Sequence, residues 1–373
     1  MASVELDKKN AGDVFPMDEP VEGLADTEDS GLGDYPIDTL LIRTESRTVF
    51  DVVRRIQAGG FVLNPDFQRE FVWPLEKQSK LIESVVMRIP LPVFYLAEDK
   101  QGRTIVVDGL QRLSTFRDFL GNAFRLKLPH QASLDNHTFQ ELTPKLQNRI
   151  EDCNLVLYII DSKVPERAKL DIFERVNSGE PLTRQQMRNC LFMGPATQWL
   201  KTEASTELFQ KATGGSLNVK SMRDREFINR FCAFHLLGAE TYNKSDMDEF
   251  LAMALTKMNE MTEDERRELS NAFHLGLKNN LEIFGRHAFR KHGPDQTNRS
   301  VVNASLWDVM STGLAQYSAE RVSQAADKLR SVFYPLLENS EFNDAITYSP
   351  NSTNRVRDRF SMSRKMFREV FGD

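Results

Sequence analysis

Residues 104–116 read TIVVDGLQRLSTF, and the rest of the chain can be interpreted outward from them. The β-branched run at 104–107 predicts a short buried strand, and Asp108-Gly109 marks a sharp turn. Apolar residues then recur at helical spacing, which predicts a helix directly after the turn. They are Leu110, Leu113, Phe116, Phe119 and Leu120. A strand, a turn and a helix therefore follow one another without a gap.

This junction places Asp108 where a strand ends and a helix begins. Backbone N–H groups and the positive end of the helix dipole gather there, and both attract anions such as phosphate. Gln111 and Arg112 add polar donors, and a guanidinium can hold a phosphate or carboxylate through two hydrogen bonds. A structural role explains the residues equally well: Asp108 would cap the helix, Gly109 would fit the turn, and Arg112 would pair with an acid.

The composition is that of an ordinary globular protein. The 373 residues are 40% hydrophobic and 27% charged, which is enough for two cores. No apolar run approaches the length of a membrane span, and the polar N-terminus has no signal-peptide pattern. The Cys residues lie far apart and predict neither a disulfide framework nor a zinc motif. We therefore expect a cytoplasmic protein, and the net charge of -6 confines any nucleic-acid contact to local basic patches.

Three regions follow from the patterns along the chain, and together they predict an α+β protein. Residues 1–34 are acidic with few large apolar groups, which predicts a disordered tail, either solvated or DNA-mimicking and autoinhibitory. Residues 35–195 mix strand and helix patterns and predict an α/β domain. Residues 196–373 carry only helical patterns and predict an all-helical domain.

Within residues 35–195, strands are expected where short apolar or alternating runs occur. They are expected at 61–63, 93–97, 104–107, 124–128 and 155–160. The strands at 93–97 and 104–107 should pair as a hairpin. Caps and helical spacing predict the helices. They are expected to begin near 49 after Ser46 or Thr48, near 75, at 110, near 142, at Pro165 and after Thr183.

The loop at 64–74, NPDFQREFVWP, lies between two prolines and is dense in aromatic and polar residues. Phe67, Phe71 and Trp73 are expected to anchor the loop to a core. Gln68 and Arg69 have no such structural explanation, and they are better candidates for a site.

Three segments resemble one known family. PDFQREFVW at 65–73 resembles the "P-x-F-Q-R-x-x-x-W" motif of the domain-of-unknown-function 262 family, which occurs at the N-terminus of GmrSD-like type IV restriction enzymes. DGLQRLST at 108–115 resembles its "D-G-x-Q-R-x-[ST]-[ST]" signature. IFERVNSG at 172–179, followed by Leu182, is similar to its third motif. The motifs occur in the family's order.

The resemblance implies a ParB/sulfiredoxin-like nucleotide-binding fold for residues 35–195. It also implies binding or hydrolysis of a nucleoside triphosphate (NTP) in bacterial defence against foreign DNA. By matching position it implies catalytic roles for Asp108, Gln111 and Arg112. Nucleotide and phosphate binding would fall to Gln68, Arg69, Gly109, Arg112, Arg175 and Asn177. Asp108 would hold Mg²⁺, since that ion is commonly bound by a carboxylate together with substrate phosphates, or it would instead orient the attacking water.

Two features depart from the family's pattern. Leu110 stands where many members have Gln, which removes one polar group from the junction. Restriction-type members often continue into an HNH nuclease, but no Asp-His motif surrounds the C-terminal histidines, which are His235, His274, His287 and His292. His287 and His292 are expected to be solvated. No Walker A motif occurs, so any NTP chemistry is of another type.

Two basic clusters could contact a nucleic-acid backbone. The first comprises Lys220, Arg223, Arg225 and Arg230. The second lies on a predicted helix near the C-terminus and comprises Arg355, Arg357, Arg359, Arg364, Lys365 and Arg368. Solvated helix faces paired with acids elsewhere explain both clusters equally well.

Two functions are compatible with these observations. The first is an NTPase (a phosphoric anhydride hydrolase) module of an anti-phage, restriction-like defence system, which lacks its own HNH nuclease and works with DNA and a separate nuclease or defence subunit. The second is a non-enzymatic ParB-like DNA-binding or adaptor protein, in which nucleotide is a switch ligand or plays no part. An oligomer or a purely structural subunit is compatible with either.

Overall fold

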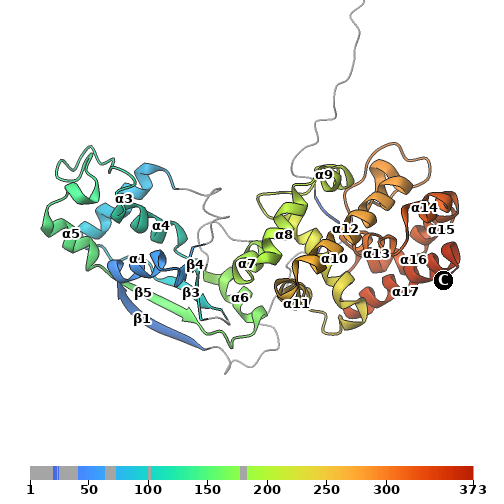
Figure 1. Cartoon of the computed structure of the whole chain (residues 1–373), viewed down its shortest axis with the longest axis horizontal. Helices are drawn as coiled ribbons and strands as arrows, with labels where there is room; N and C mark the ends of the chain where they lie inside the picture. Colours follow the sequence, from blue (N-terminus) through green and yellow to red (C-terminus); the bar gives the residue numbers. More distant parts are fainter. Residues whose placement is uncertain are drawn as a thin grey trace, which may run out of the picture. The chain divides into compact units, whose positions relative to one another are not determined.

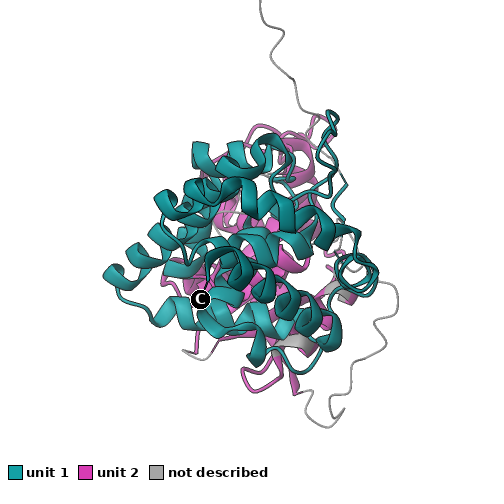
Figure 2. Ribbon diagram, turned by 90° about the vertical axis from the view of Figure 1, so that its right-hand side faces the viewer, with its two compact units in different colours: residues 1–28, 194–373 teal, residues 29–193 magenta. Residues whose placement is uncertain are grey.

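The computed structural model describes residues 20–22, 24, 41–63, 73–99, 102–176 and 183–372. The chain divides into two compact units (Figures 1 and 2). Residues 29–193 form the sheet unit, and residues 1–28 together with 194–373 form the helical unit. The fold class is α+β, as predicted, with a mixed five-stranded sheet in the first unit and helices in the C-terminal region.

The sheet unit alternates strands with helices. Its elements are β1 (Ile42–Thr48), α1 (Val49–Gln57), β2 (Phe61–Val62), α3 (Leu75–Val86), β3 (Phe94–Glu98), β4 (Thr104–Asp108), α4 (Leu110–Leu120), α5 (Pro144–Glu151), β5 (Asn154–Ile160), α6 (Glu166–Val176) and α7 (Arg184–Leu191). The strand order is β1-β5-β3-β4-β2. β1 pairs antiparallel with β5 and β3 antiparallel with β4, whereas β5–β3 and β4–β2 are parallel.

Both faces of this sheet are covered, because side chains alternate along each strand. Leu96 on β3 and Leu157 on β5 point into a core that also holds Phe116 of α4 and residues of α1, α3 and α5. Ala97 of β3 and Ile160 of β5 point to the opposite face of the sheet, into a second core formed with α6 and α7. β4 thus lies inside the sheet with helices on both sides, and it contributes Val106 to the first core and Val107 to the second.

Several sequence predictions are confirmed in this unit. Strands occur near 61–63, 93–97, 104–107 and 155–160, and β3 and β4 form the expected hairpin. The side chain of Thr48 caps α1, and that of Thr183 caps α7.

Two local predictions need correction. The strand at 124–128 is absent: Leu126 and Leu128 are buried as expected, but the backbone N–H groups of residues 126–128 bond to loop carbonyls and side chains. The structure also contains a strand, β1, that the sequence patterns did not predict. It is an edge strand in which Arg43 and Arg47 pair with acids, so it lacks the apolar alternation on which strand prediction relies.

The helical unit packs around one central helix. Its elements are α8 (Pro195–Ala204), α9 (Glu207–Thr213), α10 (Arg223–Leu237), α11 (Met247–Glu260), α12 (Glu263–Phe284), α13 (Ala304–Leu314), α14 (Ala319–Gln324), α15 (Ala326–Glu338), α16 (Ser340–Thr347) and α17 (Thr353–Phe371). Every residue of α13 is buried, so this helix forms the middle of the core. Within the described part of the chain, no helix has both the length and the apolar character to cross a bilayer.

A short piece of the acidic N-terminal segment belongs to this unit. The Glu22 N–H donates to the Val302 carbonyl at 2.9 Å, and the Ala304 N–H donates to the Glu22 carbonyl at 2.8 Å. The Glu22 carboxylate bonds to the Lys291 ammonium at 2.6 Å. The expectation of a solvated tail therefore does not hold at Glu22, which binds the N-terminal end of α13.

Candidate functional site

The predicted junction is present where β4 ends at Asp108 and α4 begins at Leu110. Gly109 between them adopts φ +98°, a left-handed conformation that side chains disfavour. A Cβ at this position would lie 2.2 Å from Cδ1 of Phe94 and 3.2 Å from Nη2 of Arg112. No side chain caps the N-terminus of α4. Glycine is thus required for the turn, and the start of the helix is left without a side-chain cap, as an anion site requires.

Arg112 ties this junction to the segment before β3. Its Nη2 donates to Oδ2 of Asp108 at 2.9 Å and to the Val93 carbonyl at 3.0 Å, while Nη1 donates to the Pro92 carbonyl. The guanidinium carbon lies 4.1 Å from the centre of the Phe94 ring, a cation–π distance. The structural interpretation, in which Arg112 pairs with an acid, is therefore realised with Asp108.

The two partners differ in exposure. The Arg112 side chain is 10% exposed and the Asp108 side chain 30%. Burial lowers the pKa of Arg112, and the neighbouring Asp108 carboxylate opposes that shift. An arginine remains charged at neutral pH after such a shift. The junction thus presents a partly exposed carboxylate whose orientation is fixed by a buried cation.

Gln111 joins the first and second motifs. Its Oε1 accepts a hydrogen bond at 3.0 Å from the backbone N–H of Trp73, the last residue of the first motif. Gln68 and Arg69 of that motif lie outside the described residues. Trp73, the last residue of the first motif, is therefore held at the first turn of α4.

The third motif runs along α6. Arg175 lies in the last turn of this helix and is exposed, and Asn177 lies outside the described residues. α6 contributes Phe173 to the same core as Val107 of β4. The motif is therefore attached to β4, the strand that ends at Asp108.

Helix α7 contains polar residues that sequence reasoning did not assign to a site. Gln185, Arg188 and Asn189 are each 1% exposed, and Nε of Arg188 donates to Oε1 of Gln185 at 3.0 Å. Met187 of the same helix packs with Val107 of β4. The sequence did carry a signal for these residues. The helix directly after the third motif has polar residues on every face, and such a helix is unusual in a core.

A metal at this junction would have few protein ligands. Among the described residues there is no group of three or more His, Cys, Asp or Glu side chains able to hold a metal ion. Asp108 alone fits Mg²⁺, in the arrangement where one carboxylate and substrate phosphates share the ion.

The C-terminal histidines have structural partners. Nε2 of His274 bonds to Oε2 of the buried Glu203 at 2.6 Å, and His235 stacks on Phe231. His292 is 8% exposed and packs among aromatic rings, which include that of His287. The expectation that His292 is solvated is therefore wrong, because the loop before α13 folds back against α12 and α15.

The structure separates the members of the two basic clusters. Arg225 and Arg230 of the first cluster are buried, Arg223 pairs with Glu226, and Lys220 is exposed. In the second cluster Arg359 is fully buried, and its Nη2 bonds to Oδ2 of Asp308 at 2.8 Å. The prediction that Arg359 contacts nucleic acid is wrong, since its guanidinium is inside the core.

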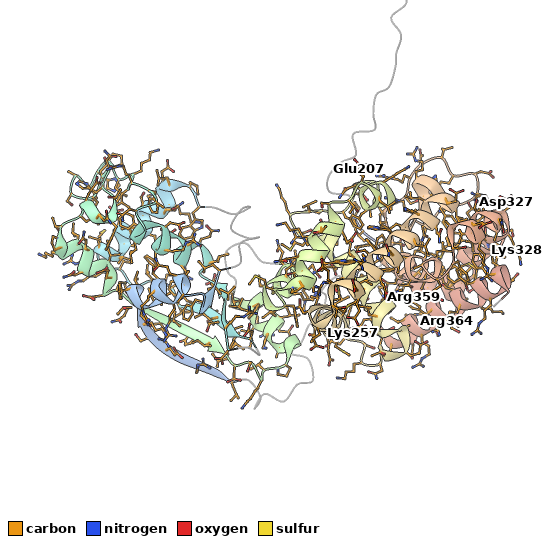
Figure 3. All side chains as sticks on the ribbon, viewed as in Figure 1. Glu207, Lys257, Asp327, Lys328, Arg359 and Arg364 are labelled. Atoms are coloured by element: carbon orange, nitrogen blue, oxygen red, sulfur yellow. The ribbon has the colours of Figure 1, made fainter. Side chains whose placement is uncertain are left out.

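The other members of the second cluster lie nearer the surface. Arg355 is half-buried, whereas Arg357, Arg364 and Lys365 are exposed. Figure 3 labels Arg359 and Arg364, which share α17 but differ completely in environment.

One comparison with known proteins gives a match. Residues 49–193 match the family model of the GmrSD restriction endonuclease, N-terminal domain. The match runs from α1 to the end of α7 and contains the β4–α4 junction. No curated protein and no solved structure matches the chain. Residues 49–193 are therefore similar to a GmrSD-type N-terminal domain, a domain named for restriction enzymes.

Proposed function

We propose that residues 49–193 bind a nucleoside triphosphate at the β4–α4 junction and hydrolyse it. The protein would act in the cytoplasm as one module of a restriction-like defence system directed at DNA, and the domain would belong to the ParB/sulfiredoxin-like group. DNA cleavage would fall to a separate protein. The family match at residues 49–193 supports the defence role.

The turn at Gly109 is the observation that supports nucleotide binding most strongly. The left-handed glycine lets the backbone fold tightly between β4 and α4, and it leaves the N-terminus of α4 without a side-chain cap. Strand–glycine–helix junctions of this kind bind phosphate because backbone N–H groups and the helix dipole point the same way. The triphosphate would lie against the first turn of α4.

The side chains around this turn have distinct proposed tasks. Arg112 would hold Asp108 in place through the 2.9 Å bond between them. Asp108 would bind Mg²⁺ together with the phosphates, and the ion would supply positive charge against the triphosphate. Gln111 would orient the phosphates or the attacking water without adding charge. Arg69 and Arg175 would contribute cations, with Gln68 and Asn177 as polar contacts.

A non-enzymatic DNA-binding or adaptor protein is the second candidate. The contacts of Arg112 favour it, because its two terminal nitrogens already bond to Asp108 and to the carbonyls of Pro92 and Val93. A cation used in this way contributes little to a phosphate clamp. Nucleotide would then bind weakly or not at all, and the junction would be a structural turn.

Phosphate release by the purified full chain separates the two candidates. ATP, GTP, CTP and UTP are offered with Mg²⁺, with and without duplex DNA. The first candidate predicts turnover that falls about 100-fold or more in Asp108→Ala, the range typical of a lost catalytic group.

The matched control is Asp118→Ala, because Asp118 lies on α4, the helix that follows Asp108, and pairs with Arg117 at the surface. This variant should keep wild-type turnover. Tight DNA binding by a full chain that releases no phosphate from any nucleotide would establish the second candidate instead.

A further inference from the structure

The exposed side of α17 is strongly basic. Four cationic residues of this helix are exposed, and we call them the basic stripe: Arg357, Arg364, Lys365 and Arg368. The acids of α17 are Asp358, which is half-buried, and Glu369, which is exposed. The stripe therefore forms a local positive surface on a chain whose formal net charge is -6.

The three arginines of the stripe are nearly collinear. At 3.6 residues per turn, Arg357, Arg364 and Arg368 fall within roughly 40° of one another around the helix axis. At about 1.5 Å per residue they are spaced by about 10 Å and then about 6 Å. The three guanidinium groups can therefore face one polyanion at the same time.

The buried side of α17 holds the stripe in a fixed direction. Val356, Phe360 and Phe367 pack into the core of the helical unit. Arg359 adds a bond from its Nη2 to Oδ2 of Asp308 at 2.8 Å. Because one face of the helix is buried in this way, the opposite face cannot rotate inward.

Ion pairing occupies only part of the stripe. Within the described residues, the basic stripe forms one ion pair, between Arg364 and Glu240. Both side chains of this pair are more than half exposed. Exposed pairs of this kind are weak and yield to a stronger anion. Lys328 donates to the carbonyls of residues 369 and 370, and Arg321 donates to that of Phe371. Two further cations therefore cover the negative end of the helix.

We propose that the basic stripe of α17 is a docking surface for the phosphate backbone of duplex DNA. The surface contacts phosphates without selecting sequence, because arginine and lysine on one helix face reach charge and not base edges. It rests on the proposed function only for the choice of DNA as the polyanion. It uses residues outside the proposed nucleotide site.

Fluorescence anisotropy with a labelled 20-bp duplex tests this surface on the full chain without nucleotide. Binding should weaken with salt, with a slope of log K against log salt near -3.6 for four phosphate contacts. The double variant Arg357→Gln/Arg368→Gln should reduce the magnitude of that slope by about 2 and weaken binding at least tenfold at low salt.

The control variant Arg267→Gln/Lys278→Gln removes the same charge from exposed positions of α12. It should bind like the wild type. Equal weakening in both double variants, or no binding by the wild type at 50 mM salt, would overturn the proposal. Tighter binding of poly-glutamate than of duplex at equal salt would also overturn it and would point to an acidic protein partner.

The nucleotide proposal fails separately from this one. Stripe variants should keep wild-type phosphate release in the absence of DNA. Asp108→Ala should keep wild-type DNA affinity and salt slope, because Asp108 lies in the sheet unit and the stripe lies on α17.

Discussion

The molecule contains two arginine–aspartate clusters that use the same chemistry, one partly exposed and one fully buried. In the sheet unit, Arg112 bonds to Asp108 at 2.9 Å, and the Asp108 side chain is 30% exposed. In the helical unit, Asp308 bonds to Arg230 at 2.5 Å and to Arg359 at 2.8 Å, and all three side chains are 0% exposed. A ligand can reach the first carboxylate but not the second.

This difference shows that exposure, and not the presence of a charged pair, separates a candidate site from a structural tie. The Asp308 cluster holds α10, α13 and α17 together, and two cations share one anion inside the core. Burial, together with the nearby Arg230, lowers the pKa of Arg359 to about 10. The Asp108 cluster instead leaves its acid at the end of a strand, where it can accept another partner.

The largest effect on the free energy of unfolding is expected at the fully buried Asp308 cluster. Asp308→Asn leaves two buried guanidinium groups without a compensating charge. Loss of one partner of a buried pair lowers the free energy of unfolding by about 3–5 kcal/mol. Urea unfolding followed by circular dichroism measures the change.

Asp327→Asn is the control for this prediction. The Asp327 side chain is 99% exposed and pairs with Arg330 on the surface. It should change the free energy of unfolding by less than about 0.5 kcal/mol. Similar losses in the two variants would contradict the assignment of the Asp308 cluster as a structural tie.

The second largest effect is expected at the Gly109 turn, which lies beside the partly exposed Asp108 cluster. Gly109→Ala would place a Cβ 2.2 Å from the Phe94 ring at φ +98°. Strain and overpacking together should lower the free energy of unfolding by about 2–4 kcal/mol.

Gly59→Ala isolates the contribution of packing. Gly59 has φ +75°, but nothing lies within 4 Å of a Cβ there. A loss of only about 1 kcal/mol is expected, from backbone strain alone. If denaturation shows equal losses at the two glycines, the close approach at Gly109 has no energetic importance.

The smallest effect is expected at a third cluster, which is on the surface. Asp51 bonds to Arg54 at 2.7 Å and to Arg47 at 2.8 Å, and these partners lower the pKa of Asp51 to about 2. Because the folded-state pKa lies below the unfolded one, the stabilisation is present above pH 4 and is lost as pH falls toward 2.

Asp51→Asn should therefore cost about 1 kcal/mol at pH 6, after allowance for solvent screening. The difference from wild type should shrink when unfolding is measured at pH 3 and below. A difference independent of pH would mean that the Asp51 side chain acts through neutral hydrogen bonds and not through charge.

Local patterns predicted the parts of the molecule that depend on neighbours in sequence. The junction at 104–116 was predictable because a β-branched run, Asp-Gly and a helical repeat occur in succession. The sequence also allowed Arg112 to pair with an acid, but it did not identify that acid as Asp108, four residues earlier. Thr48 and Thr183 were recognisable as caps for the same reason, since a cap bonds within its own first turn.

Non-local partners explain what the sequence could not show. Arg359 resembled its exposed neighbours in composition, but its bonds go to Asp308, which is 51 residues away. His274 pairs with Glu203 across 71 residues. β1 is stabilised by its register with β5 and not by apolar alternation. In each case the deciding partner comes from a different element.

Hydrogen exchange of the full chain with each nucleoside triphosphate and Mg²⁺ tests the central claim, nucleotide binding at the β4–α4 junction, most directly. The amides of residues 110–112, at the start of α4, should exchange more slowly with nucleotide. Those of α1 should not change, and Asp108→Ala should abolish the protection. The claim would be contradicted if a nucleotide that stabilises the protein left the exchange of amides 110–112 unchanged. Protection confined to another element would also contradict it.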